Sequence, residues 1–157
     1  MNAVLSVNEL GRQSLIIYAV AYTLATVGMF TVLAKLKDYT YDGFNGLAKS
    51  NPTLAFATAI FIFSLAGIPL TGGFMAKYYA VSALMMQGNA MWLVIFALFM
   101  AAVSVYYYFR VIWAMYFKPG TPQLHAPVTA TDNGLLMFTA ALVILVGVAP
   151  QVVLAFA

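Results

Sequence analysis

Between Lys49 and Arg110 the only charged residue of this chain is Lys77, and the rest of that interval is predominantly apolar. Apolar stretches of this length are typical of membrane-spanning helices, because a helix satisfies its own backbone groups where lipid offers no hydrogen bonds. Of the 157 residues, 64% are hydrophobic and 7% are charged. Roughly a quarter of the residues of a soluble domain are charged. The sequence therefore predicts an all-α integral membrane protein.

Four apolar segments, separated by polar stretches, are candidates to cross the bilayer. A helix rises about 1.5 Å per residue, and the hydrocarbon core is about 30 Å thick. The four predicted transmembrane segments are residues 14–36, 52–86, 90–117 and 134–150.

The second segment is too long for one straight helix, since residues 52–86 would extend about 50 Å. Pro69 lacks a backbone N–H and clashes with the preceding turn. Gly72 and Gly73 loosen the chain further. We therefore expect a discontinuous helix with a non-helical break at 69–73. Broken helices of this kind line the ion sites of many transporters.

Lys77 closely follows this predicted break and precedes Gln87, the polar end of the segment, by ten residues. That separation places it about 15 Å from the end, or half the depth of the core. A charge at this depth is costly and typically marks an ion path. Burial disfavours the ammonium form, so a buried lysine can exchange its proton near neutral pH. We interpret Lys77 as a proton relay in a cavity shaped by Pro69, Gly72 and Gly73.

Two questions about Lys77 stay open at this point. The alternative to a relay is a lysine that snorkels to the membrane interface. No acidic residue lies in any predicted span, so a partner charge has to come from elsewhere in the protein or from another subunit. Backbone carbonyls freed by the break are candidate acceptors for the ammonium.

Hydroxyl groups recur along the first span. Tyr18, Tyr22 and Thr26 are spaced by four residues and therefore share one helix face. They either line a water path, or they pack and bond within their own helix. The run 106–108, three tyrosines followed closely by Arg110, favours an aromatic belt with a snorkelling arginine.

Neither a metal site nor a nucleic-acid surface is predicted. The chain has no Cys, and His125 is its only His, so disulfides, thiolate sites and His clusters are excluded. The basic residues are scattered and mostly flank the apolar spans, where lipid headgroups are better partners than nucleic acid.

The distribution of basic residues predicts an orientation. Arg12 is the one basic residue on the side of the termini. The side of the two long loops carries five: Lys35, Lys37, Lys49, Arg110 and Lys118. Positively charged loops remain in the cytoplasm, so we expect cytoplasmic long loops and external termini.

Four stretches of the sequence resemble a known family: 21–30, 64–79 (SLAGIPLTGGFMAKYY), 105–111 and 147–151. In order and spacing they are similar to the antiporter-like subunits of complex I, the proton-pumping NADH–quinone oxidoreductase, and specifically to its chain N subunit. The resemblance covers essentially the whole chain and corresponds to the last four helices of that subunit. It therefore implies a C-terminal fragment. The short apolar start, 1–5, is no signal peptide and suits either the tail of a missing helix or a short interfacial segment.

The resemblance implies a function. Lys77 aligns with the lysine that follows the broken helix and belongs to the family's proton path. The implied activity is proton translocation across the bacterial inner membrane, coupled to quinone reduction elsewhere in the complex. The implied partners are the lipid bilayer and the other membrane subunits. No flavin, iron–sulfur or quinone site is expected in this chain. The family's other essential charges, on earlier helices, have no counterpart here.

Two rival interpretations remain. Multisubunit cation/proton antiporters and membrane-bound hydrogenases contain related subunits, so the chain is alternatively part of an exchanger that is not coupled to NADH oxidation. The second rival is a structural membrane anchor with an incidental lysine.

Overall fold

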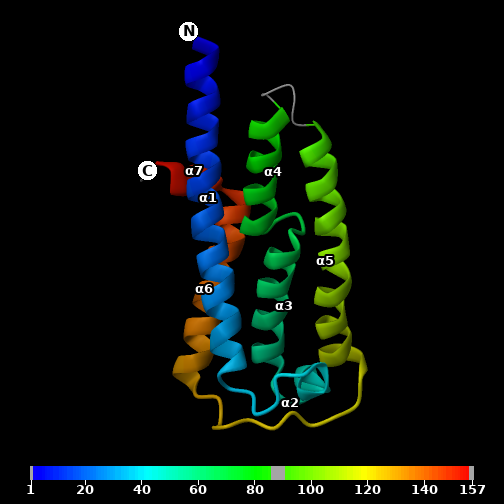
Figure 1. Cartoon of the computed structure of the whole chain (residues 1–157). Helices are drawn as coiled ribbons and strands as arrows, with labels where there is room; N and C mark the ends of the chain where they lie inside the picture. Colours follow the sequence, from blue (N-terminus) through cyan, green and yellow to red (C-terminus); the bar gives the residue numbers. More distant parts are fainter. Residues whose placement is uncertain (1, 86–90, 156–157) are drawn as a thin grey trace.

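The computed structural model describes residues 2–85 and 91–155 and is a bundle of helices (Figure 1). The elements are α1 (Asn2–Leu33), the 3-10 helix η1 (Tyr41–Phe44), α2 (Leu47–Ser50), α3 (Pro52–Ala66), α4 (Gly72–Met85), α5 (Met91–Phe117), α6 (Ala130–Val148) and α7 (Pro150–Leu154). Extended pairing in the described residues is limited to one isolated bridge between Leu36 and Leu124.

Three helices are long and apolar enough to cross a membrane. They comprise Gly11–Leu33 within α1, the whole of α5 and the whole of α6. The 15 residues of α3 are also apolar but form a shorter helix. The predicted all-α membrane class is therefore confirmed.

Helix boundaries at the two ends of the chain differ from those predicted. α1 continues through the polar residues 6–13, which include good helix formers, and it ends at Leu33. α6 begins at Ala130 because Thr129 and Asp132 form a capping box that starts the helix before the apolar residues. The predicted bounds at 86 and 90 lie outside the described residues.

The gap between α3 and α4 also lies earlier than predicted. α3 ends at Ala66 and α4 begins at Gly72, so the non-helical link is 67–71 rather than 69–73. Gly72 and Gly73 are helical. The reason is local: Gly67 ends α3 before Pro69 is reached, and Ser64 caps the first turn of α4.

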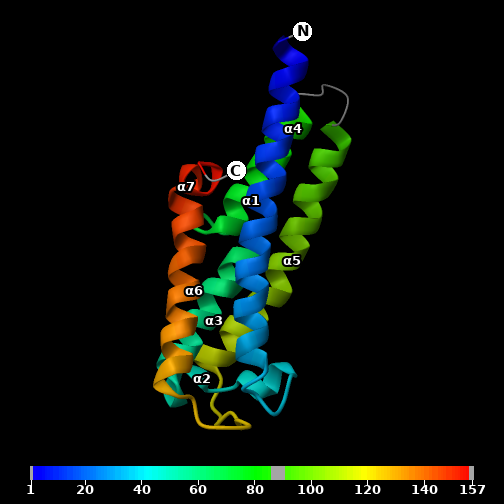
Figure 2. The ribbon, with the colours of Figure 1, turned by 90° about the vertical axis from the view of Figure 1, so that its left-hand side faces the viewer.

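α3 lies at the centre of the bundle. Figures 1 and 2 show α3 and α4 following one another along the bundle, with α1 and α6 on one side and α5 on the other. Leu54, Phe61 and Ile62 of α3 are fully buried or nearly so. α5 instead exposes large apolar side chains along most of its length, as Trp92 and Phe99 illustrate. An exposed apolar face of this kind suits lipid or a neighbouring helix.

α1 and α3 approach each other closely at Gly28. A Cβ on Gly28 would lie 2.6 Å from Cε1 of Phe61, whose ring is fully buried. Ala21 and Ala25, on the same face of α1, are also buried. The absence of a side chain at Gly28 lets α1 and α3 pack closely, whereas Ala21 packs in a cluster with Ala76 of α4.

At the end of the bundle opposite the N-terminus, the two long polar segments are joined to each other. The Lys37 N–H donates to Gln123 O, and the His125 N–H donates to Lys35 O, both at 2.9 Å. Arg110, two turns before the end of α5, lies over the Tyr41 ring of η1 at 4.3 Å from the centroid. The loop hydrogen bonds and the packing of Arg110 on the Tyr41 ring together hold the loops against the helices.

Candidate functional site

The site is built around the end of α3. Gly67 adopts the left-handed conformation, with φ 82° and ψ 41°. Its N–H and that of Ile68 both reach back to the Phe63 carbonyl at 2.9 Å. A glycine in this conformation ends a helix without the steric cost that a Cβ would add. α3 therefore ends at Ala66, three residues before Pro69.

α4 begins against the last turns of α3. The buried Ser64 hydroxyl accepts a hydrogen bond from the Gly73 N–H at 3.1 Å. The first N–H groups of a helix have no partner within the helix, and here a residue of the preceding helix supplies one. Gly73 has no room for a side chain, because a Cβ there would overlap the Ser64 carbonyl. This contact fixes the start of α4 beside α3.

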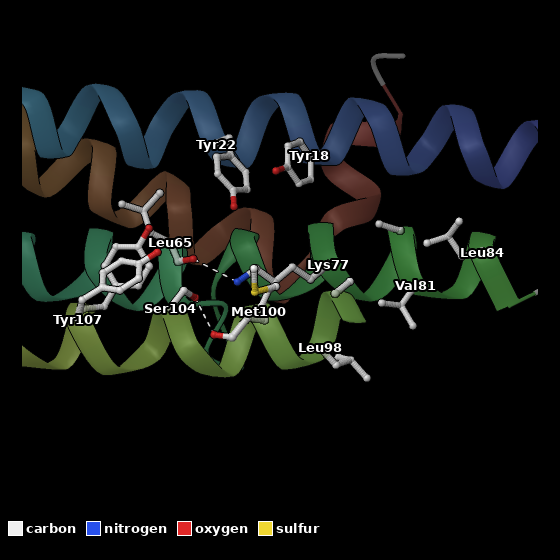
Figure 3. Close-up of a pocket in the computed structure, with 14 residues that line it drawn as sticks. Tyr18, Tyr22, Leu65, Lys77, Val81, Leu84, Leu98, Met100, Ser104 and Tyr107 are labelled. Atoms are coloured by element: carbon white, nitrogen blue, oxygen red, sulfur yellow. Dashed lines mark hydrogen bonds between the residues drawn. The ribbon is translucent and has the colours of Figure 1, made fainter. Parts of the chain in front are cut away.

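Lys77 reaches back across the link from the second turn of α4. Its Nζ donates to the carbonyl oxygens of Ala66 at 2.8 Å and of Leu65 at 3.2 Å (Figure 3). These are carbonyls of the last turn of α3, which have no helical partners and form the negative end of its dipole. The ammonium of the half-buried Lys77 thus binds the carbonyl groups at the end of α3, which are the acceptors predicted at the break.

A cavity of about 370 Å³ lies beside Lys77, between α1, α4 and α5. Tyr18 and Tyr22 project into it from α1, and their rings stack with centroids 4.3 Å apart (Figure 3). A second cavity of about 340 Å³ also borders Lys77 and is lined by Ala66 and Gly67. A water molecule takes up roughly 30 Å³ in the liquid, so each cavity has room for several.

The structure separates the predicted site residues into two groups. Tyr18 and Tyr22 lie in the same cavity as Lys77, whereas Thr26, farther along α1, is not among the residues that line it. Pro69, Gly72 and Gly73 line neither of the two cavities. The backbone that borders Lys77 is instead that of residues 65–67.

α5 contributes further residues to the site, beyond those that the sequence indicates. Ser104, Tyr107 and Tyr108 line the larger cavity, although the tyrosines were interpreted as an aromatic belt. Tyr106, in contrast, is 71% exposed and faces outward. Spacing along the sequence does not indicate these residues: Lys77 lies ten residues before Gln87, whereas Ser104 lies fifteen residues after Asn89.

Among the described side chains, no carboxylate pairs with Lys77. The ion pairs there are Lys35 with Asp132 at 2.7 Å and Lys118 with Asp42 at 3.5 Å, both outside the cavity. Nor does any group of three or more His, Asp or Glu side chains gather in that part of the chain to hold a metal. The chemistry that the site supports is therefore proton binding at one amine, beside hydroxyl groups and space for water.

Comparison with known proteins places this arrangement in a family. Residues 1–104 match the family model described as NADH:quinone oxidoreductase/Mrp antiporter, transmembrane. NADH-quinone oxidoreductase subunit N of Trichlorobacter lovleyi is 37% identical over 153 residues, which cover 94% of this chain and 31% of that protein. The subunit N of Cytophaga hutchinsonii is also 37% identical, over 91% of this chain and 32% of that protein.

A solved structure shares the fold. A chain of respiratory complex I from Thermus thermophilus with bound aureothin superposes with a TM-score of 0.81 at 29% identity, covering 91% of this chain and 34% of the other. The chain thus spans about a third of the length of the relatives it matches. It belongs to the NADH:quinone oxidoreductase/Mrp antiporter membrane family, and within that family it is similar to subunit N.

Proposed function

We propose that this chain is the C-terminal part of a proton-translocating subunit of NADH–quinone oxidoreductase and that Lys77 is a proton relay within it. The observation that carries the proposal is the position of Lys77. Its amine lies beside a cavity lined by Tyr18 and Tyr22 and donates to the carbonyls at the end of α3 that lack helical partners. A charge within apolar sequence is energetically costly and typically marks an ion or proton path.

In this proposal Lys77 exchanges a proton with water in the cavity, and the carbonyls of Leu65 and Ala66 stabilise the charged form. Tyr18 and Tyr22 orient that water. The charge that drives the exchange comes from a residue outside this chain. Quinone reduction takes place in other subunits, so the chain acts as part of a translocase and needs no cofactor of its own.

We further propose that residues 1–157 form one part of the membrane domain, with four crossings. α3 and α4 contain 15 and 14 residues, or about 22 and 21 Å of helix, so each is shorter than a hydrocarbon core of about 30 Å. Their succession along the bundle supports one discontinuous crossing, with the link 67–71 inside the membrane (Figure 1).

The proposed setting is the bacterial inner membrane, with the long loops in the cytoplasm and the termini outside. Lys35, Lys118 and Arg110 support this orientation, since they gather at the loop end of the bundle. The exposed apolar face of α5 would lie against lipid or the other membrane subunits of the complex.

A second candidate is a subunit of a cation/proton antiporter. The family model that matches the chain is named for both classes, and this is the observation that favours it. The subunit N relatives favour the oxidoreductase.

The test uses the complete protein, assembled in its complex in inverted membrane vesicles. Lys77→Ala should leave NADH oxidation measurable and reduce proton uptake per NADH oxidised, since loss of a positioned proton-transfer group typically slows transfer about a hundredfold or more. Lys77→Arg should also be impaired, because arginine does not release its proton. Uptake is followed with a fluorescent ΔpH indicator.

Lys49→Ala is the matched control, since Lys49 is exposed at the end of α2 and should pump normally. Normal pumping by both Lys77 variants would reject the relay and leave a structural anchor. A ΔpH that forms with a sodium gradient, and not with NADH, would establish the antiporter instead.

A further inference from the structure

The motif 147–151 has no role in the proposed relay, yet its first residue lies against the link. A Cβ on Gly147 of α6 would lie 2.5 Å from the Leu70 carbonyl oxygen and 2.6 Å from its carbon, and it would overlap the Thr71 carbonyl carbon. Gly147 is buried. Figure 2 shows the link projecting toward the C-terminal part of α6, just before α7. The α6 backbone therefore rests on the Leu70–Thr71 peptide with no room for a side chain.

Local hydrogen bonds also hold the link: the Thr71 N–H donates to the Ile68 carbonyl at 3.3 Å, and the Thr71 carbonyl accepts from the Phe74 N–H of α4 at 3.1 Å. Leu70 has a φ of 74°, a left-handed conformation that a non-glycine residue adopts at a cost. Its side chain is 70% exposed and does not anchor the link. Thr71 is buried, and its hydroxyl donates to the Ile68 carbonyl at 2.7 Å, which closes the link on itself. In addition to these local hydrogen bonds, the α6 backbone at Gly147 limits the movement of the 70–71 peptide.

α6 is well placed to hold the link, because it is fixed along its length. At its start, Asp132 pairs with Lys35 of α1 at 2.7 Å. Leu136, Ala140 and Val143 are buried in the core. Near its end, the Val143 carbonyl oxygen would lie 3.3 Å from a Cβ on Gly72, so α6 also touches the first residue of α4.

The link connects Lys77 to its own acceptors. Leu65 and Ala66 lie just before it, and Lys77 lies just after it on α4. A shift of the 70–71 peptide therefore changes the separation between the ammonium and both carbonyls. A displacement of about 1 Å can cost about a hundredfold in a step that depends on positioning.

We propose that Gly147 is a positioning residue for Lys77: the side-chain-free backbone of α6 at Gly147 holds the link at the distance that keeps Lys77 on the carbonyls of α3. This inference rests on the relay function proposed above. It assigns to the end of α6 a role in the proton path that involves no polar side chain.

The experiment introduces Gly147→Ala into the complete protein in its assembled complex. Gly134→Ala is the matched control, since Gly134 lies on the same helix and a Cβ there meets nothing within 4 Å. Gly147→Ala should lower proton uptake per NADH oxidised severalfold and shift the pH profile of pumping, because the acceptors of the ammonium move. Gly134→Ala should change neither.

A rescue variant separates positioning from general damage. Leu70→Gly widens the backbone conformations open to residue 70, so the 70–71 peptide can rotate away from a methyl group at 147. Added to Gly147→Ala, it should restore pumping and the pH profile. Lowered pumping with an unshifted profile and no rescue would overturn the proposal, as would normal pumping by Gly147→Ala.

Two further comparisons distinguish a failure of assembly and a failure of the Lys77 relay from a loss of the role of Gly147. If Gly147→Ala does not assemble but the double variant with Leu70→Gly does, the contact is supported. If neither assembles, Gly147 serves the whole fold and the positioning role is rejected. Lys77→Ala is measured alongside: its normal pumping would remove the proposed function, whereas impaired Lys77→Ala with intact Gly147→Ala would remove only the role of Gly147.

Discussion

The Lys77 ammonium donates to the Ala66 carbonyl at 2.8 Å and so closes the gap between α4 and the end of α3. The last carbonyls of a helix lack helical partners and need a hydrogen-bond donor from outside the helix. One cation therefore serves both as the cap of α3 and as the proposed relay. A neutral amine still donates hydrogen bonds, but without charge assistance these are weaker. Proton loss at Lys77 would thus loosen the cap rather than remove it.

Gly67→Ala should disturb the contact between Lys77 and the end of α3. Gly67 has a φ of 82°, which costs an L-residue roughly 1–2 kcal/mol. A Cβ there would also lie 2.8 Å from Lys77 Cδ and 2.9 Å from Nζ, so the lysine has to move. We expect a lower midpoint of thermal unfolding for the solubilised protein and reduced pumping. An unchanged midpoint would show that the link relaxes freely.

Ser64→Ala should weaken the start of α4. The substitution removes the acceptor of the buried Gly73 N–H, and loss of a helix cap typically costs about 1 kcal/mol. Ser104→Ala is the matched control for stability, because the Ser104 hydroxyl bonds only the Ala101 carbonyl of its own helix. Thermal unfolding midpoints compare the two. Equal effects would mean that the Ser64–Gly73 bond contributes nothing specific.

The sequence was sufficient to predict the helices, because long apolar runs admit few other structures in lipid. It was less able to locate the break. Pro69 and the Gly72–Gly73 pair are the strongest helix breakers by type, yet Gly67 ends α3 first. Gly72 and Gly73 are helical, since the Ser64 hydroxyl accepts from the Gly73 N–H in the first turn of α4, and close neighbours leave both positions no room for a side chain. Such close approaches depend on tertiary packing, which local preference does not encode.

The candidate site was likewise only partly predictable. Lys77 stands out as an isolated charge, and the spacing of Tyr18 and Tyr22 indicates a shared face. Tyr107 and Tyr108 were harder to assign, since consecutive residues of a helix point in different directions. Which of the tyrosines of α5 faces Lys77 depends on the rotation of α5 about its axis, and this is set by packing.

Gly28→Ala should destabilise the contact of α1 with α3. The new methyl group would lie 2.6 Å from Cε1 of the buried Phe61 ring, and overpacking of this kind typically costs about 1–3 kcal/mol. Gly11→Ala, on the same helix, is the control because a Cβ there meets nothing within 4 Å. The midpoint of thermal unfolding should therefore be lower for Gly28→Ala than for Gly11→Ala. If Gly28→Ala unfolds at the wild-type temperature, the ring has space to move and the packing is looser than the structure indicates.

Asp132→Ala should destabilise the bundle more than Lys35→Met. The Asp132 carboxylate accepts from Lys35 at 2.7 Å and also from the Thr129 N–H at 2.9 Å, so its removal breaks both an ion pair and the capping box of α6. Lys35→Met breaks only the ion pair. Lys118→Met should have the smallest effect, because its pair with Asp42 is long and exposed, and such pairs contribute little. The order of the three unfolding midpoints checks this ranking. If Asp132→Ala and Lys35→Met lower the unfolding midpoint equally, the ion pair alone, and not the capping box, stabilises the start of α6.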